Sequence, residues 1–99
     1  VTSRAARLEA MRQQGIPTSQ QPSKQMKTQA GRSYEYEVPA PGGGERTMAV
    51  IQHPVDKRHG PHWEAGVAKP GSRDRFNRPR HFNEDPVTER KKSRVPYNR

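Results

Sequence analysis

Three of the four histidines in this 99-residue chain fall between His53 and His62. A histidine whose pKa is about 6.5 can take up and release protons at neutral pH, which suits general acid and base catalysis. Cleavage of an RNA phosphodiester needs a base for the 2′-OH proton, an acid for the leaving oxygen, and cations for the charge that grows on phosphorus. The same stretch and its continuation contain Lys57, Arg58 and Glu64, so every group that this reaction needs is close in sequence.

The candidate catalytic residues are the histidines and the nearby carboxylate: His53, His59, His62, His81 and Glu64. A structural or merely exposed role is the alternative for each histidine, because HxxH spacing also occurs in plain turns. A zinc site without cysteine would need His59, His62, His81 and a carboxylate to converge, and no second paired motif supports one. We therefore expect no cofactor, and a divalent metal is needed only if the chain is a metal-dependent nuclease.

A second set of residues is positively charged and is expected to contact phosphates. Residues 69–80 carry five basic residues against the single acid Asp74, and their prolines and Gly71 predict a loop without regular structure. Trp63, the only tryptophan, is either a core anchor or a platform on which a base stacks. A weaker basic run lies at residues 90–92, where a solvated surface is the default. The predicted substrate-binding residues are Lys57, Arg58, Trp63, Lys69, Arg73, Arg75, Arg78 and Arg80.

The composition indicates a polyanionic partner. The chain has 19 Lys and Arg against 10 Asp and Glu, a net charge of +9, and only 27% hydrophobic residues. Lysine and arginine gain affinity for phosphates by releasing counterions, so nucleic acid is the leading partner, ahead of an acidic protein or anionic lipid. The lack of cysteine excludes disulfides and a cysteine nucleophile. The longest apolar run, residues 48–51, is far too short to span a bilayer.

The elements that must position these groups are one short helix and a small sheet. Ser3 predicts the N-cap of a helix over residues 4–14, with Ala5, Leu8 and Met11 on its apolar face and Gly15 after its end. Residues 18–31 are polar and predict an extended connector, with at most one helical turn at residues 23–28.

Strand patterns begin after the connector. Tyr34, Tyr36 and Val38 alternate with glutamates, and residues 46–53 are apolar on both faces, so the two segments predict a β-hairpin across a glycine-rich loop. Shorter strands are predicted at residues 63–67, 78–82 and 93–97, and Pro79 confines the second of these to a sheet edge. The expected fold class is α+β: residues 1–31 form the helix and connector, and residues 32–99 form a small β-rich catalytic region, within one domain overall.

Several motifs resemble those of one protein group. The segment GIPTSQQPSK of residues 15–24, which follows the basic helix AARLEAMRQQ, is similar to the linker that leads into the C-terminal toxin domains of bacterial polymorphic toxins. The strands containing YEY and VIQH, and the motif GPHWEAG of residues 60–66, resemble one group of those domains. The resemblance covers residues 4–97 and concerns toxins of the Rhs, wall-associated-protein and LXG kinds.

The resemblance implies a secreted antibacterial effector, carried as the C-terminal part of a larger protein and acting in the cytoplasm of a target cell. The start at Val1 fits that expectation. Such domains are usually nucleases that a cognate immunity protein neutralises, and the charge of this chain predicts an acidic one. The expected activity is histidine-assisted cleavage of tRNA or rRNA on a ribonuclease-toxin-like fold. A metal-dependent DNase of the HNH type and a non-catalytic nucleic-acid-binding module are the alternatives, although the paired spacing of the HNH type is absent.

Overall fold

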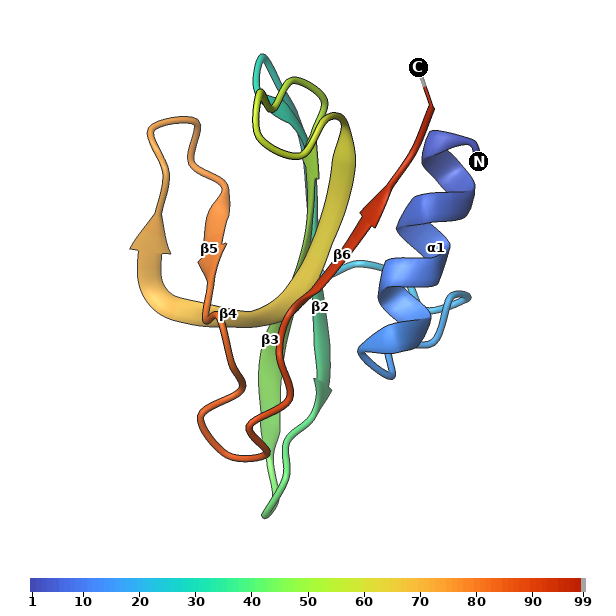
Figure 1. Ribbon diagram of the computed structural model, residues 1–99. Helices are drawn as coiled ribbons and strands as arrows, with labels where there is room; N and C mark the ends of the chain where they lie inside the picture. The colour runs from blue at the N-terminus through green and yellow to red at the C-terminus, as the bar shows by residue number, and fades with distance from the viewer. Residues whose placement is uncertain (99) are drawn as a thin grey trace.

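The computed structural model describes residues 1–98, in which one helix packs across an antiparallel sheet (Figure 1). The helix α1 spans Ser3–Gln13. Its N-cap is Thr2, whose Oγ1 accepts a hydrogen bond from the Ala5 amide at 3.0 Å, so the cap lies one residue before the predicted Ser3. Gly15 follows the helix with φ of 70°, the left-handed conformation expected after a helix end.

Within residues 1–98, six strands form the sheet, and the α+β prediction is confirmed. Their order is β1-β2-β3-β4-β5, and β6 also pairs with β4. All of these neighbours are antiparallel. The strands are β1 Lys24–Thr28, β2 Gly31–Pro39, β3 Glu45–His53, β4 His62–Arg73, β5 Pro79–His81 and β6 Ser93–Pro96. The predicted hairpin is β2 and β3, and the predicted edge strand and final strand are β5 and β6.

Two predictions about irregular segments are wrong. Residues 24–28 are neither a connector nor a helical turn, because they pair with β2 from Lys24 opposite Glu35 to Thr28 opposite Gly31. The basic stretch is not a loop throughout, because β4 continues through Pro70 to Arg73. The register of β4 against β5 shifts between Ala68 and Arg73, and an irregularity of this kind is where a sheet tolerates proline.

One face of the sheet packs on the helix and forms the core. The buried helix residues are Ala6, Ala10 and Met11, whereas Ala5 of the predicted stripe is exposed. They pack against inward residues of β2, β3 and β4, which include the predicted Trp63, Ala65 and Val67. Burial of each large apolar side chain contributes about 1.5–3 kcal/mol to the free energy of folding. This burial stabilises the short helix, which would be marginal alone.

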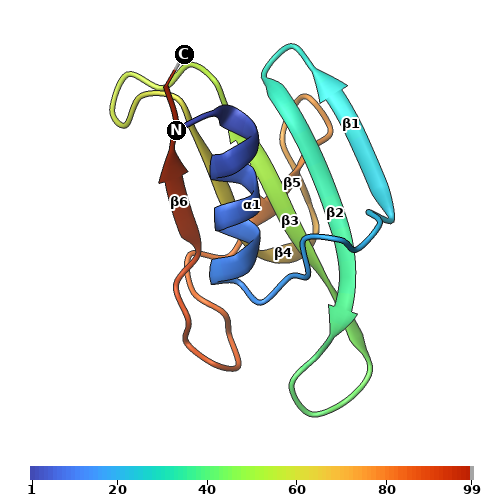
Figure 2. The same ribbon diagram turned by 90° about the vertical axis from the view of Figure 1, so that its right-hand side faces the viewer.

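The opposite face of the sheet is covered by the chain itself. Strand β4 curls strongly (Figure 1), so β5 and the segment after it lie behind the sheet when α1 faces the viewer (Figure 2). Successive side chains of a strand alternate between faces, so Ala49, Ile51 and His53 lie opposite the core residue Val50. His53, together with His62 and Glu64 of β4, therefore lies on the face without the helix. Among residues 1–98, no helix has the length and apolar character needed to cross a membrane.

Candidate functional site

Glu64 of β4 is the centre of the candidate site. Its carboxylate is close to cationic or titratable groups of four strands and of the segment before β6, so residues that are far apart in sequence converge on it. The groups within 4 Å of it are His62 Nε2 at 3.0 Å, Lys92 Nζ at 3.0 Å, His53 Nε2 at 3.7 Å, His81 Nδ1 at 3.9 Å and Arg94 Nε at 3.9 Å.

Strand register places these groups together. His53 is directly opposite His62 across β3 and β4, and their rings stack with centroids 5.0 Å apart. Glu64 follows two residues after His62 and so lies on the same face. A Cβ on Gly66 would lie only 2.9 Å from Lys92 Cβ and 3.5 Å from His81 Cδ2. Gly66 is therefore the residue that lets Lys92 and His81 approach β4 beside Glu64.

The electrostatics of the site keep Glu64 ionised. Burial alone would raise the pKa of Glu64, but hydrogen bonds from Lys92 and His62 and the nearby positive charges outweigh burial and lower it from 4.5 to about 2. A carboxylate with so low a pKa is a poor proton acceptor at neutral pH. Glu64 is therefore suited to orienting and stabilising the cations around it.

His62 is buried and fully hydrogen-bonded. Its side chain is 1% exposed, Nδ1 lies 2.8 Å from the Gly60 carbonyl oxygen, and Nε2 lies 3.0 Å from Glu64 Oε2. Both partners are acceptors without a proton, so the ring makes both bonds only when each nitrogen donates. His62 is thus held in a fixed position against the stacked ring of His53.

His53 and His81 have the properties of proton acceptors at neutral pH. Burial is the main cause that lowers the pKa of both side chains, and the negative charge of Glu64 opposes it in each case. The ring of His81 approaches the Ala49 carbonyl oxygen through Nε2 at 2.7 Å, so Nε2 carries the proton and Nδ1 is free to accept one. The side chain of His53 is 31% exposed and therefore reachable from solvent.

These two histidines share a pocket of about 340 Å³, which we call the histidine pocket. Glu64 and Lys92 also line it, and Arg80 of β5 adds an exposed cation at its wall. Its other lining residues are Ile51, Asp74, Arg78 and Pro79. A proton acceptor, a second titratable group and two cations thus surround one space that is open to solvent.

The histidine pocket does not contain the HxxH pair that the sequence emphasises. His59 lies in the turn before β4, where its Nδ1 is 3.7 Å from Asp56 Oδ2 and its ring is nearly perpendicular to that of His62, with centroids 5.8 Å apart. Lys57 and Arg58 are exposed in the same turn. The structure brings His53, His81 and Glu64 together and leaves His59 outside the pocket.

Two of the predicted phosphate-binding arginines are used inside the protein. Arg78 is 5% exposed and donates to Asp74 and to the carbonyl oxygens of Ala30 and Gln52. Arg73 makes a two-point ion pair with Glu35, at 3.1 and 3.2 Å. A buried guanidinium group needs such acceptors, so the prediction for Arg78 is corrected to a structural role. The Arg73 side chain is 35% exposed, and its ion pair with Glu35 gives it a structural partner as well.

The remaining predicted cations, Lys69, Arg75 and Arg80, have exposed side chains. Lys69 Nζ lies 5.9 Å from the centre of the Phe82 ring, and the Arg75 guanidinium lies 4.9 Å from that of Phe76. Such contacts leave the charge available to a phosphate. These three cations and the turn containing Lys57 and Arg58 are the positions where contact with a polyanion is possible.

Trp63 is a core residue, which corrects its assignment to substrate binding. It is 2% exposed, and its Nε1 donates to Ser3 Oγ of the helix at 2.9 Å. The Arg7 guanidinium lies 5.9 Å from the centre of its ring. A base cannot stack on a ring that is covered in this way.

Sequence reasoning missed the cations that hold Glu64. Lys92 belongs to the basic run at residues 90–92, which predicts a solvated surface, and Arg94 lies opposite Glu64 in β6. A glycine inside a strand pattern signals the close approach of another segment, so Gly66 was the available clue. Also missed was the ion pair of Arg46 with buried Asp85, which holds the pKa of Asp85 well below its usual value.

One group of residues in the site could hold a metal ion. Ligand atoms of His53, His62 and Glu64 lie within 4.8 Å of one another. The hydrogen bond from His62 Nδ1 to a backbone carbonyl would fix Nε2 as the ligand atom, as in many metal-binding histidines. Lys92 and Arg94 already supply positive charge to the same carboxylate, which lowers the electrostatic benefit of a cation there.

Comparisons with known protein families, curated proteins and solved structures identify no relative of this chain. No protein-family model matches the chain, and no curated protein or solved structure is significantly similar to it.

Proposed function

We propose that this chain is an endoribonuclease that uses His53 and His81 for acid and base catalysis without a metal. The observation that carries the proposal is the approach of both histidines and Lys92 to Glu64 within one solvent-accessible pocket. General acid and base catalysis requires two proton-transfer groups near the reacting atoms, and cations lower the energy of the charged transition state.

The reaction follows from the environments of the two rings. His53, the more exposed ring, takes the proton of the 2′-OH, and the 2′ oxygen forms a bond to phosphorus. The bond from phosphorus to the 5′ oxygen breaks, and the leaving oxygen takes a proton from Nδ1 of His81, which has first taken that proton from solvent and returns to the neutral ring. Glu64 stabilises each imidazolium, and Lys92 and Arg80 stabilise the negative charge on the phosphate oxygens. The products are a 2′,3′-cyclic phosphate and a 5′-hydroxyl, so the substrate must be RNA.

A cleavage assay tests the proposal directly. Purified protein is incubated with total RNA and with plasmid DNA, each with and without EDTA, and RNA ends are analysed for cyclic phosphate. We expect cleavage of RNA alone, unaffected by EDTA. Intact RNA under both conditions would overturn the proposal.

Matched variants then test the residues. His53→Ala, and His81→Gln, which keeps a donor for the Ala49 carbonyl, should each lower the cleavage rate by about 10²–10⁴-fold. His59→Ala removes a histidine outside the pocket and should leave the rate close to that of the unmodified protein. Thermal unfolding confirms that each variant is folded. If all three variants cleave RNA at the rate of the unmodified protein, neither His53 nor His81 takes part in catalysis.

A metal-dependent nuclease is the second candidate, and the observation that favours it is the grouping of His53, His62 and Glu64. These residues would hold the ion, which would activate a water and polarise the phosphate. Under this alternative, EDTA abolishes cleavage and DNA becomes a possible substrate. The assay above therefore separates the two candidates.

The biological role that we propose, an antibacterial toxin domain delivered as part of a larger protein, is supported by the motif resemblance of residues 4–97. Its partner would be an acidic immunity protein, because the net charge of +9 attracts an acidic surface. Expression in bacterial cytoplasm should stop growth, and His53→Ala should relieve the effect. Growth arrest that persists in this variant would favour a non-catalytic nucleic-acid-binding module.

A further inference from the structure

A second pocket lies beside the histidine pocket. Its volume is about 580 Å³, which is within the range of small-molecule sites, and Pro79 lines both pockets. Its walls include the apolar side chains of Val67, Pro70, Phe82 and Val87, as well as charged groups of β2, β3 and β4. We call it the Glu37 pocket after the carboxylate discussed next.

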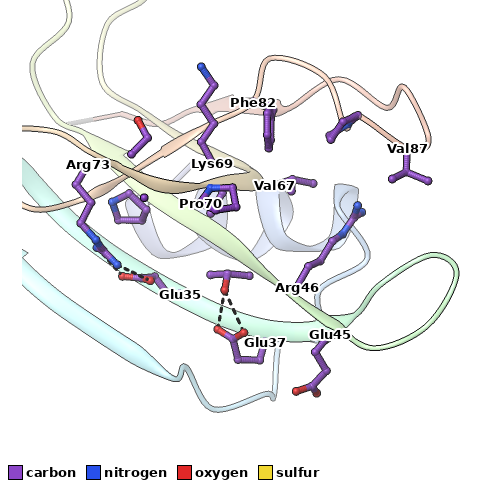
Figure 3. Close-up of a pocket in the computed structure, with 16 residues that line it drawn as sticks. Glu35, Glu37, Glu45, Arg46, Val67, Lys69, Pro70, Arg73, Phe82 and Val87 are labelled. Atoms are coloured by element: carbon purple, nitrogen blue, oxygen red, sulfur yellow. Dashed lines mark hydrogen bonds and ion pairs between the residues drawn. The ribbon is translucent and has the colours of Figure 1, made fainter.

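Glu37 is a carboxylate of this pocket that is held in place and has unused capacity to accept hydrogen bonds. It accepts from Thr47 Oγ1 at 3.0 and 2.9 Å and from Ser23 Oγ at 3.1 Å, and within residues 1–98 no cation pairs with it. Each hydroxyl has one hydrogen to donate, whereas an ionised carboxylate has about four acceptor positions. Glu35, in contrast, is already paired at both oxygens with Arg73 (Figure 3). Glu37 is therefore fixed in place and able to accept more donors.

The chemistry of a fixed carboxylate selects one nucleobase. Two adjacent donors are needed to satisfy both oxygens, and guanine has them in N1–H and the N2 amino group. The pairing edges of adenine, cytosine and uracil each mix a donor with acceptors, which a carboxylate repels. Phe82 gives the pocket an aromatic side chain on which a base can stack, and single-stranded RNA is commonly read by stacking together with hydrogen bonds to the base edge.

The Glu37 pocket is one nucleotide step from the proposed chemistry. Thr47, which holds Glu37, and Ala49, whose carbonyl oxygen accepts from His81, are two residues apart on the same face of β3. Two residues of a strand span roughly 6.6 Å. The base and the 3′ phosphate of one nucleotide are separated only by its ribose, which is a span of the same order. A base in the Glu37 pocket can thus have its own 3′ phosphate near His81.

We propose that the Glu37 pocket binds a guanine base of the RNA and directs cleavage to the phosphate that follows it, an inference that rests on the proposed ribonuclease function. Glu37 accepts hydrogen bonds from guanine N1–H and N2–H, and Phe82 stacks on the ring. Glu37 is a specificity residue and takes no part in proton transfer.

Nucleotide binding tests the pocket without catalysis. The dissociation constants of guanosine, adenosine, cytidine and uridine 3′-monophosphates are measured by calorimetry. The guanosine nucleotide should bind at least tenfold more tightly than the others, and Glu37→Gln should weaken it about 10- to 100-fold, as expected for loss of charge-assisted hydrogen bonds. Glu84→Gln, an exposed residue outside the pocket, removes the same charge and should leave binding unchanged. Equal affinity for the four nucleotides would overturn the inference.

A second variant guards against loss of structure in Glu37→Gln. Phe82→Leu removes the stacking surface while keeping an apolar residue, and it should weaken guanosine nucleotide binding with Glu37 intact. Unchanged affinity in both folded variants would place the nucleotide elsewhere.

Mapping of RNA ends separates the two proposals. If the protein cleaves RNA after every base and binds the four nucleotides equally, the guanine site is rejected and the ribonuclease proposal is supported. If the protein binds the guanosine nucleotide selectively but does not cleave RNA, the ribonuclease proposal is rejected and the guanine site is supported.

Discussion

Replacing Glu64 by glutamine should destabilise the domain at neutral pH, and the loss should fade in acid. The substitution keeps the shape of the side chain but removes the charge that faces His62, His53, His81 and Lys92. Lys92, which is partly buried, would lose its ion-pair partner, and a buried charge without its partner is costly.

The magnitude follows from the pKa of Glu64. At about 1.4 kcal/mol per pKa unit, lowering it from 4.5 to about 2 is worth about 3 kcal/mol at neutral pH. Part of the site is open to solvent, which screens these interactions, so we expect a measured loss of about 2 kcal/mol. This contribution is complete above pH 4.5, because the carboxylate is then ionised in both folded and unfolded chains. It is lost as the pH falls toward 2.

The assay is urea unfolding of the unmodified protein and of Glu64→Gln at a series of pH values between 7 and 2. The difference between the two free energies of unfolding should be about 2 kcal/mol at pH 7 and should shrink steadily below pH 4.5. Glu9→Gln, an exposed helix residue, is the matched control and should stay within about 0.5 kcal/mol throughout. A difference that is absent at pH 7, or constant down to pH 2, would refute the account of Glu64.

Three further predictions concern other parts of the molecule. Gly31→Ala should lower the free energy of unfolding by at least about 2 kcal/mol in urea titrations, because φ is 119° and a Cβ would lie 2.5 Å from the Gln52 carbonyl oxygen. The fluorescence of Trp63 should stay unchanged when RNA is added, since the ring is buried, and strong quenching would contradict this. Arg75→Ala should reduce the slope of log K against log salt for RNA binding by about 0.7, with little change in stability.

The parts of the fold that bury apolar residues at a regular period were predictable. Tyr34 and Tyr36 alternate with polar residues, so the hairpin of β2 and β3 follows from the sequence. Strand β1 carries no such pattern, because it is an edge strand whose residues are mostly exposed and whose structure comes from pairing with Gly31–Pro39. The full length of β4 was not predicted for a different reason. A proline usually ends a strand, but Pro70 lies where the register between β4 and β5 is irregular.

The candidate site was only half predictable. Clustering in sequence identified His53, His62 and Glu64, because one turn joins the strands that carry them. The curl of β4 brings His81 to the same carboxylate, and no local pattern reports a tertiary bend. Counting positive charges in the sequence did not separate Arg78 from the exposed arginines, because the sequence does not show that the Arg78 side chain is buried.

Strands β4 and β5 differ in the number of strands that pair with them, and this difference affects how easily each one opens. Strand β4 pairs with β3, β5 and β6, whereas β5 is a three-residue edge strand held on one side. Amide protons of residues 63–67 should therefore exchange with solvent only when the whole domain opens, and those around His81 should exchange through a smaller local opening. The pocket can thus widen by release of His81 while Glu64 and His53 stay in place. A bound RNA that contacts both sides would oppose this release and slow exchange mainly in β5.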